Sequence, residues 1–177
     1  MNNSLIISLL FLIVGCSRLI DEPSLIEKNG VMYLPQSDKP YSGEVSKSDN
    51  FGKTLLKGTY KNGKKDGLWT EWDENGQKKS EGKFEDDKKD GLWKDYYENG
   101  QLQEEGHYKE GKYEGLWRRY FDNGILSIKG NYKDDKQDGF WKSYYDNGQL
   151  KYEWNYKEGE LISQKCWDED GNEKECE

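Results

Sequence analysis

The stretch Gly91–Glu114, GLWKDYYENGQLQEEGHYKEGKYE, decides the fold of this chain, because most of the remaining sequence repeats it. A Gly-(Leu/Phe)-Trp triplet, an Asn-Gly pair and a Gly-x-aromatic triplet recur 24 residues apart in one register. The first triplet begins at Gly67, Gly91, Gly115 and Gly139. A fixed period in this range is typical of a repeat architecture. We therefore expect a row of similar units rather than one unique pocket.

The composition narrows the class of protein. Of 177 residues, 32% are hydrophobic and 35% are charged, yet the chain has 7 Trp, 13 Tyr and 5 Phe. Disordered chains are poor in aromatic residues, so we expect the aromatic side chains to supply the buried surface of a thin repeat array. The net charge of −8 argues against a nucleic-acid partner, because binding phosphates needs a basic surface.

Each repeat is predicted to form a β-hairpin around its Asn-Gly pair. Asn-Gly between strands favours a two-residue type I′ turn, in which both central residues have positive φ. At Asn99-Gly100 such a turn pairs Tyr97 with Leu102, Asp95 with Glu104, Trp93 with Gly106, and Gly91 with Tyr108. A large ring lying across a cross-strand glycine covers its exposed backbone. We expect this face of the sheet to be the aromatic core.

The opposite face of each hairpin is predicted to be polar. In the same register Lys94 faces Glu105, Tyr96 faces Gln103, Leu92 faces His107 and Lys142 faces Glu153. Opposite charges across two strands stabilise a sheet by about 0.2–1 kcal/mol, but the pair Arg118–Lys129 brings like charges together. The aromatic residues of this face form a candidate interaction surface: Trp72, Tyr96, Tyr120 and Tyr144.

The predicted fold is all-β, an elongated antiparallel β-hairpin array of about ten strands at ~5 Å spacing. We assign residues 28–177 to this repeat domain. The clear repeats span residues 67–90, 91–114, 115–138 and 139–162, and the degenerate caps span residues 40–66 and 163–177.

The N-terminus carries a predicted export signal. Residues 1–15 contain the apolar run Leu5–Val14, which is too short to span a membrane as a helix and is typical of a signal peptide. The run ends in Ile13-Val14-Gly15-Cys16, which resembles the lipobox of bacterial lipoproteins, although the n-region lacks Lys and Arg. The resemblance implies cleavage before Cys16, a lipid on its thiol and a place in the bacterial envelope, at the outer membrane if the host has one. An ordinary secretory signal with a chance cysteine is the alternative. Residues 16–27 are predicted to be a tether.

The repeat pattern resembles the bacterial variants of the MORN-repeat superfamily. The sequence Gly-x-Tyr-Lys-x-Gly-Lys-x-x-Gly-Leu-Trp-x-x-Tyr-Tyr-x-Asn-Gly-Gln-Leu is nearly complete across residues 106–126, with Phe121 and Ile125 as departures. The resemblance implies a hairpin array used as a binding or scaffolding surface. Some bacterial relatives are labelled antitoxins, so the resemblance also implies an antitoxin or immunity-like alternative, which a lipobox does not suit.

The sequence offers few groups for catalysis or metal binding. His107, the only histidine, lies on the predicted polar face with no Ser or Cys nucleophile in phase, so we expect it to be solvated. The segment 168–172, DEDGN, lacks the ligand spacing of a calcium loop and is predicted to be a turn. We expect no enzymatic activity, no cofactor and no metal.

Two cysteines remain once Cys16 is lipidated. Outside the cytoplasm, Cys166 and Cys176 are predicted to form a disulfide across the last turn. A simple turn at Asp170-Gly171 places Cys166 opposite Glu175, so free thiols are the alternative.

The regular aromatic residues also allow a ladder that binds wall glycans or choline, because ring faces stack on sugars and on quaternary ammonium groups. The match of rings to glycines favours the core instead. We therefore expect a lipid-anchored, non-enzymatic protein that binds an unknown protein partner, with glycan binding and toxin neutralisation as alternatives.

Overall fold

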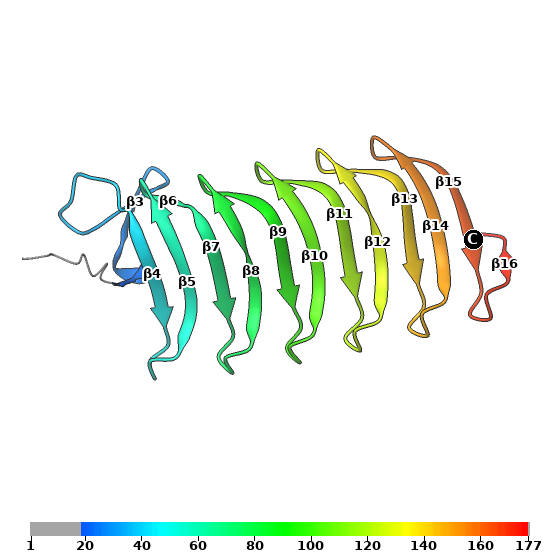
Figure 1. The fold of residues 1–177 in the computed structure, drawn as a ribbon, viewed down its shortest axis with the longest axis horizontal. Helices are drawn as coiled ribbons and strands as arrows, with labels where there is room; N and C mark the ends of the chain where they lie inside the picture. Colours follow the sequence, from blue (N-terminus) through cyan, green and yellow to red (C-terminus); the bar gives the residue numbers. More distant parts are fainter. Residues whose placement is uncertain (1–18, 177) are drawn as a thin grey trace, which may run out of the picture.

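The computed structural model describes residues 19–176. They form one 14-stranded sheet and a separate two-stranded sheet at the N-terminal end. Figure 1 shows the strands side by side in chain order, from blue to red, as one long curved sheet. The prediction of an all-β, elongated hairpin array is confirmed. The sheet exceeds the predicted ten strands because the cap segments contribute strands of their own.

The strands follow the 24-residue period. The main sheet contains β1 (Ile20–Asp21), β4 (Gly43–Ser48), β5 (Thr54–Lys61), β6 (Lys64–Lys65), β7 (Gly67–Trp72), β8 (Lys78–Glu85), β9 (Lys88–Tyr96), β10 (Leu102–Lys109), β11 (Lys112–Tyr120), β12 (Leu126–Lys133), β13 (Lys136–Tyr144), β14 (Leu150–Lys157), β15 (Glu160–Trp167) and β16 (Glu173–Lys174). The small sheet contains β2 (Ile26–Lys28) and β3 (Val31–Tyr33), and η1 (Glu22–Ser24) is a short 3₁₀ turn. Neighbouring strands are antiparallel, except that β1 runs parallel to β4.

The predicted tether, residues 16–27, is wrong for residues 20–27. These residues form β1, η1 and most of β2, and β1 pairs with β4 through Ile20 and Val45. Leu25 and Val45 are buried in a cluster with Tyr60 and Trp69. Burial of apolar side chains at the end of a thin sheet explains why this segment folds onto the array. Cys16 and the predicted signal peptide lie outside the described residues.

The turn at Asn99-Gly100 differs from the predicted type I′ turn. Only Gly100 has positive φ, at 83°. The Gly100 N–H donates to the Tyr97 carbonyl (2.9 Å), and the Tyr97 N–H donates to the Gln101 carbonyl (2.8 Å). These bonds define a three-residue loop, a type I turn followed by a left-handed glycine. Type I′ geometry occurs instead between repeats, where Glu110 and Gly111 have φ of 51° and 86°.

A β-bulge at Gln103 restores the predicted register. Beside the turn, Leu102 pairs with Tyr96, so the predicted pairs Tyr97–Leu102 and Tyr96–Gln103 are wrong. Beyond the bulge, Asp95–Glu104, Trp93–Gly106 and Gly91–Tyr108 pair as predicted. The longer loop shifts the register by one residue, and the bulge shifts it back. The hairpins around Gly52, Gly76, Gly124 and Gly148 have the same irregularity.

Each tryptophan ring of the core lies on the glycine of the preceding repeat, not on its own hairpin partner as predicted. A methyl group added to Gly82 would collide with the Trp93 ring. The Trp93 indole N–H donates to the Lys83 carbonyl at 2.8 Å, and Trp93 is only 6% exposed. The same relation joins Trp69 to Gly58, Trp117 to Gly106, and Trp141 to Gly130.

The glycine of each Gly-(Leu/Phe)-Trp triplet has a different role. No atom lies within 4 Å of a Cβ built on Gly91, so the Tyr108 ring does not cover it, contrary to the prediction. Gly91 instead has a φ of +77°, beside the register shift of β9 against β8 between Glu81 and Lys83. A residue with a Cβ costs about 1–2 kcal/mol in this conformation.

We predict that two alanine substitutions will separate these two roles. Gly82→Ala forces the Trp93 ring out of its place and should lower the free energy of unfolding by about 3 kcal/mol, the upper range for overpacking. Gly91→Ala meets open space and should cost about 1–2 kcal/mol, the backbone strain alone. Urea denaturation followed by circular dichroism measures both losses. Equal losses, with unchanged tryptophan fluorescence in Gly82→Ala, would contradict the assignment.

Candidate functional site

The face opposite the aromatic core, here called the polar face, carries three rows that cross the strands. Alternate residues of a strand share a face, so Leu92, Lys94 and Tyr96 of β9 lie on it together. The three rows contain equivalent residues of successive repeats. The apolar row is Leu68, Leu92, Leu116 and Phe140; the charged row runs from Glu81 to Lys165; and the aromatic row is Trp72, Tyr96, Tyr120 and Tyr144.

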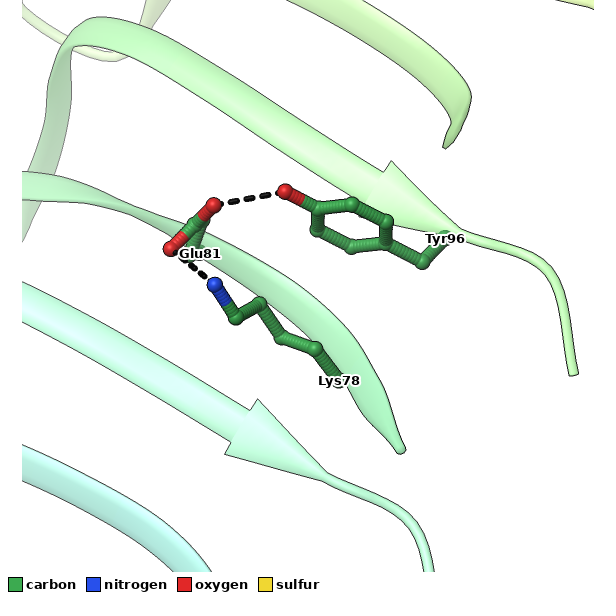
Figure 2. Close-up of polar contacts among 3 residues, drawn as sticks. All are labelled: Lys78, Glu81 and Tyr96. Atoms are coloured by element: carbon green, nitrogen blue, oxygen red, sulfur yellow. Dashed lines mark hydrogen bonds and ion pairs between the residues drawn. The ribbon is translucent and has the colours of Figure 1, made fainter. Parts of the chain in front are cut away.

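Two members of the aromatic row, Tyr96 and Tyr120, are hydrogen-bonded to the charged row. The Tyr96 hydroxyl donates to Glu81 Oε1 at 2.6 Å, and Lys78 Nζ donates to Glu81 Oε2 at 2.8 Å (Figure 2). The hydrogen bond from Lys78, and then the one from Tyr96, lower the pKa of the Glu81 carboxyl. Burial, and then the bond to Glu81, raise the pKa of the Tyr96 hydroxyl. Tyr96 therefore stays neutral and acts as a hydrogen-bond donor.

The four aromatic residues proposed from the sequence are half-buried rather than fully exposed. Tyr120 repeats the arrangement of Tyr96, because its hydroxyl donates to Glu105 Oε1 at 3.2 Å. Trp72 and Tyr96 line an open groove of about 530 Å³ at the Asn-Gly end of the first two repeats. Lys78, Lys79, Glu74 and Glu98 also line this groove. The groove thus offers ring surface flanked by charges of both signs.

The charged row alternates in sign along most of its length. Arg118 Nη1 donates to Glu105 Oε1 at 2.8 Å, and Lys142 Nζ lies 2.9 Å from Glu153 Oε2. The bond to Glu153 raises the pKa of Lys142. The Glu105 side chain is only 16% exposed, and its carboxylate accepts hydrogen bonds from both Arg118 and Tyr120.

The apolar row was missed by the sequence reading. Leu68 and Phe140 are each 59% exposed and Leu92 is 40% exposed, although apolar residues of this size are usually buried. They recur on one face at the repeat period, and exposed apolar residues that gather in this way mark interaction surfaces. The sequence does contain a signal for this row, because the predicted register places Leu92 on the polar face, and Leu or Phe recurs at this position every 24 residues.

The core face carries two adjacent carboxyl groups near the Asn-Gly end. Asp95 pairs directly with Glu104, as predicted, and Arg119 follows on the next strand. Burial raises the pKa of both carboxyl groups, and the negative charge of Asp95 raises that of Glu104 further. This is an electrostatic cost of the fold, partly offset by Arg119 and by Lys89.

The C-terminal turn holds the two cysteines together. Cys166 and Cys176 are joined by a disulfide with Cα atoms 5.4 Å apart. Lys174 lies opposite Cys166, so Cys176 reaches back from beyond the paired residues. The Asp168 carboxylate accepts the backbone N–H groups of Asp170 and Asn172 (3.0 and 2.8 Å), as in an ordinary turn.

Other candidate groups stand apart from one another. His107 is exposed on the polar face opposite Leu92. Within residues 19–176, no group of His, Cys, Asp or Glu residues is arranged to hold a metal ion. In the described part of the chain, no helix is long and apolar enough to span a membrane.

We predict that Tyr96→Phe raises the pKa of Glu81 toward its usual value, because one of its two main hydrogen bonds is lost. Glu81 stabilises the fold above its unfolded-state pKa, and this stability disappears as pH falls through the lowered folded pKa. At pH 7 the variant should lose about 1 kcal/mol, the value for one partly exposed hydrogen bond. Carboxyl NMR titration and thermal unfolding measure the two effects. Tyr144→Phe is the control, and an equal loss there would contradict the role of the Glu81 bond.

We also predict that Asp95→Asn stabilises the protein at pH 7 by about 0.5–1 kcal/mol, the scale of one like-charge cross-strand pair. The raised pKa means that the charged Asp95 destabilises the fold at neutral pH. This penalty disappears as pH falls through the raised folded pKa toward the ordinary Asp value. The advantage of the variant in thermal unfolding should therefore shrink in acid. An advantage that grows in acid would contradict the assignment.

Comparison with known proteins identifies the repeats. The family model of the MORN repeat variant matches residues 65–86, 89–110, 113–134 and 137–158. Its copies begin two residues before each Gly-(Leu/Phe)-Trp triplet. No curated protein matches the chain. MORN repeats are in general modules that bind proteins or membranes.

Two solved structures are similar to this chain at low identity and low TM-score. A mutant of S. aureus TarM in complex with Fondaparinux, alpha-GlcNAc-glycerol and UDP is 13% identical, with a TM-score of 0.34, over 65% of this chain and 21% of that one. The GtfA/B complex bound to UDP and GlcNAc is 11% identical, with a TM-score of 0.26, over 77% of this chain and 26% of that one. This chain thus spans about a quarter or less of the length of either structure. The match of the family model shows that the four copies within residues 65–158 belong to the MORN repeat variant family.

Proposed function

We propose that this chain is a non-enzymatic, lipid-anchored binding protein of the bacterial envelope, whose polar face docks onto a protein partner. The exposed apolar row carries this proposal. Leu68, Leu92 and Phe140 repeat along one face beside ordered charged and aromatic rows. Apolar patches rimmed by polar groups are typical of protein interfaces. An antitoxin or immunity-like role is the case in which that partner is a toxin.

The lipid anchor would hold the array close to the membrane. The first strand begins at Ile20, four residues after Cys16, and four residues reach at most about 14 Å. The thirteen strands of the sheet path extend about 55–60 Å at ordinary strand spacing. The N-terminal cap would therefore lie at the membrane, and the clear repeats would lie farther from it.

The charge distribution supports an array that stands away from the membrane. Residues 19–66 contain 8 Lys and 7 Asp or Glu, whereas residues 67–177 contain 18 Lys or Arg and 28 Asp or Glu. Anionic lipids repel a strongly acidic segment. A nearly neutral cap beside the membrane and an acidic array farther out keep the polar face accessible to a partner.

The anchor is tested by mass spectrometry of the mature protein from membranes. We expect an N-terminal diacylglyceryl-cysteine at Cys16, and we expect Cys16→Ser to lose the lipid mass. Ser17→Cys in the Cys16→Ser background is the matched control, because it restores a thiol one residue out of the lipobox position. A mature chain that begins elsewhere, or an unmodified Cys16, would overturn the anchor but not the binding face.

The binding face is tested by photocrosslinking in living cells. A photoreactive amino acid at Leu92 should capture a protein partner, because this side chain is exposed on the polar face. The same amino acid at Glu110, exposed in a turn between repeats, is the control. A discrete partner captured at Leu92 and absent at Glu110 supports the proposal. Equal capture at the two positions, or none at Leu92, contradicts it.

Wall-glycan binding is a second candidate, favoured by the groove that Trp72 and Tyr96 line. Ring faces in an open groove with polar neighbours suit a sugar ring. Purified peptidoglycan should then sediment the protein, and Trp72→Ala with Tyr96→Ala should abolish this. Binding that survives both substitutions would exclude the aromatic row as the glycan site.

A further inference from the structure

One position of the charged row departs from the repeat pattern. The residue at this position is a glutamate in three of four repeats, Glu81, Glu105 and Glu153, but it is Lys129 in the third. The row pairs in the order Glu81, Lys94, Glu105, Arg118, Lys129, Lys142, Glu153 and Lys165. Signs alternate at every step except on the two sides of Lys129. Like charges directly opposite each other destabilise a sheet, so this exception has a local cost.

The cations on either side of Lys129 are drawn away from it. Arg118 bonds Glu105 on one side, and Lys142 bonds Glu153 on the other, at 2.8 and 2.9 Å. Among the described residues, Lys129 itself forms no ion pair. An arginine offers five N–H donors and a lysine three, so Arg118 and Lys142 keep donors to spare. Two carboxylates and three cations leave this part of the row with one excess positive charge.

The neighbouring tyrosine lacks the acceptor that its counterparts have. The hydroxyls of Tyr96 and Tyr120 donate to Glu81 and Glu105, fifteen residues earlier in each case. The equivalent residue for Tyr144 is Lys129, whose Nζ lies 5.9 Å from the centroid of the Tyr144 ring. The Tyr144 hydroxyl has no hydrogen-bond partner among residues 19–176. Lys142 and Tyr144 are thus the counterparts of Arg118 and Tyr120, the two donors to Glu105. The carboxylate that would accept from them is missing, because Lys129 stands in its place.

We infer that Arg118, Lys129, Lys142 and Tyr144 form a binding site for a carboxylate supplied by an acidic residue of the protein partner. This inference rests on the proposed binding role of the polar face and specifies its chemistry. The partner carboxylate would accept hydrogen bonds from Lys142 and Tyr144, the counterparts of the donors that Glu105 satisfies. Leu116 and exposed Phe140 lie two residues before Arg118 and Lys142 on the same strands. The matching partner segment thus carries an apolar residue beside the acidic one.

The charge balance favours a carboxylate over a phosphate. The part of the row from Glu105 to Glu153 has one uncompensated positive charge, which one carboxylate neutralises. A phosphate monoester carries about −1.5 to −2 at pH 7 and would leave an excess of negative charge beside Glu105 and Glu153. In the second repeat, Glu105 occupies the position equivalent to Lys129, and its carboxylate accepts from the equivalent donors. The donors near Lys129 therefore have a spacing that suits a carboxylate.

The site is tested by NMR titration of the labelled full chain in nonionic detergent, with a capped peptide of six glutamates as the probe. We expect amide shifts around Lys129 and Tyr144 on β12 and β13. Lys129→Glu, which restores the residue of the sister repeats, should weaken binding at least tenfold. Lys133→Glu makes the same charge change at an exposed position of β12 outside the row, and it should bind like the wild type.

Separate outcomes distinguish the possible failures. Equal weakening by the two variants, or shifts elsewhere on the array, would overturn the site. Tighter binding of inorganic phosphate than of the glutamate peptide would assign the donors to a phosphate and overturn the carboxylate. If photocrosslinking at Leu92 captures a partner while the peptide gives no shifts, the binding face stands and the acidic partner segment is wrong. Tyr144→Phe should weaken peptide binding two- to fivefold without loss of thermal stability.

Discussion

The contact of each core tryptophan with the glycine of the preceding repeat holds this structure together. Trp93 covers Gly82 and binds the Lys83 carbonyl, so the contact fixes both the distance and the orientation of two successive repeats. A thin sheet has no second layer, and its stability must come from interactions between neighbours. At the two ends of the array, where a neighbouring repeat is missing, other residues replace the tryptophan and the glycine of this contact. Val45, fully buried, occupies the tryptophan position of the first hairpin, and Trp154 occupies the glycine position of the last.

The same contact frees the other face for variation. With the large rings committed to the core, the polar face needs only side chains that tolerate water and pair across strands. Substitutions there change charge without changing the fold, as Lys129 shows in a row of glutamates. The cost is a weakened pair on either side, about 0.2–1 kcal/mol each, which a chain with several intact hairpins can absorb. The charge pattern of the polar face can therefore vary while the scaffold stays constant.

Beyond the bulge, pairing across each hairpin was predictable from the sequence. The glycine that each tryptophan ring covers was not. Trp93–Gly106 was correct because the three-residue loop and the bulge at Gln103 cancel before that pair is reached. Gly106 lies between Trp93 and Trp117, so pairing alone does not choose the ring that covers it. The residues around Gly91 do not show that its φ is positive. The backbone role of this glycine was therefore not predictable from the sequence. The folded segment 20–27 was missed because Ile20 and Leu25 are too few and too widely spaced to show a period. The pair Arg118–Lys129 was visible in the sequence as a like-charge contact, and the structure keeps it.

The regular repeat pattern stops at the C-terminal end of the array. In a further regular repeat, a tryptophan of the next strand would cover a glycine at position 154. That position is occupied by Trp154, whose ring stacks on Tyr152 with 5.0 Å between the ring centroids. Gln164 stands opposite it where earlier repeats place a tryptophan. The disulfide then fixes the last residues across Cys166. Beyond Trp154 the sheet continues through β15 to β16, and β16 has only two residues with which a further strand could pair. The repeated rows of the polar face remain the surface on which successive units can act together, since each adds an equivalent set of contacts about 10 Å from the last.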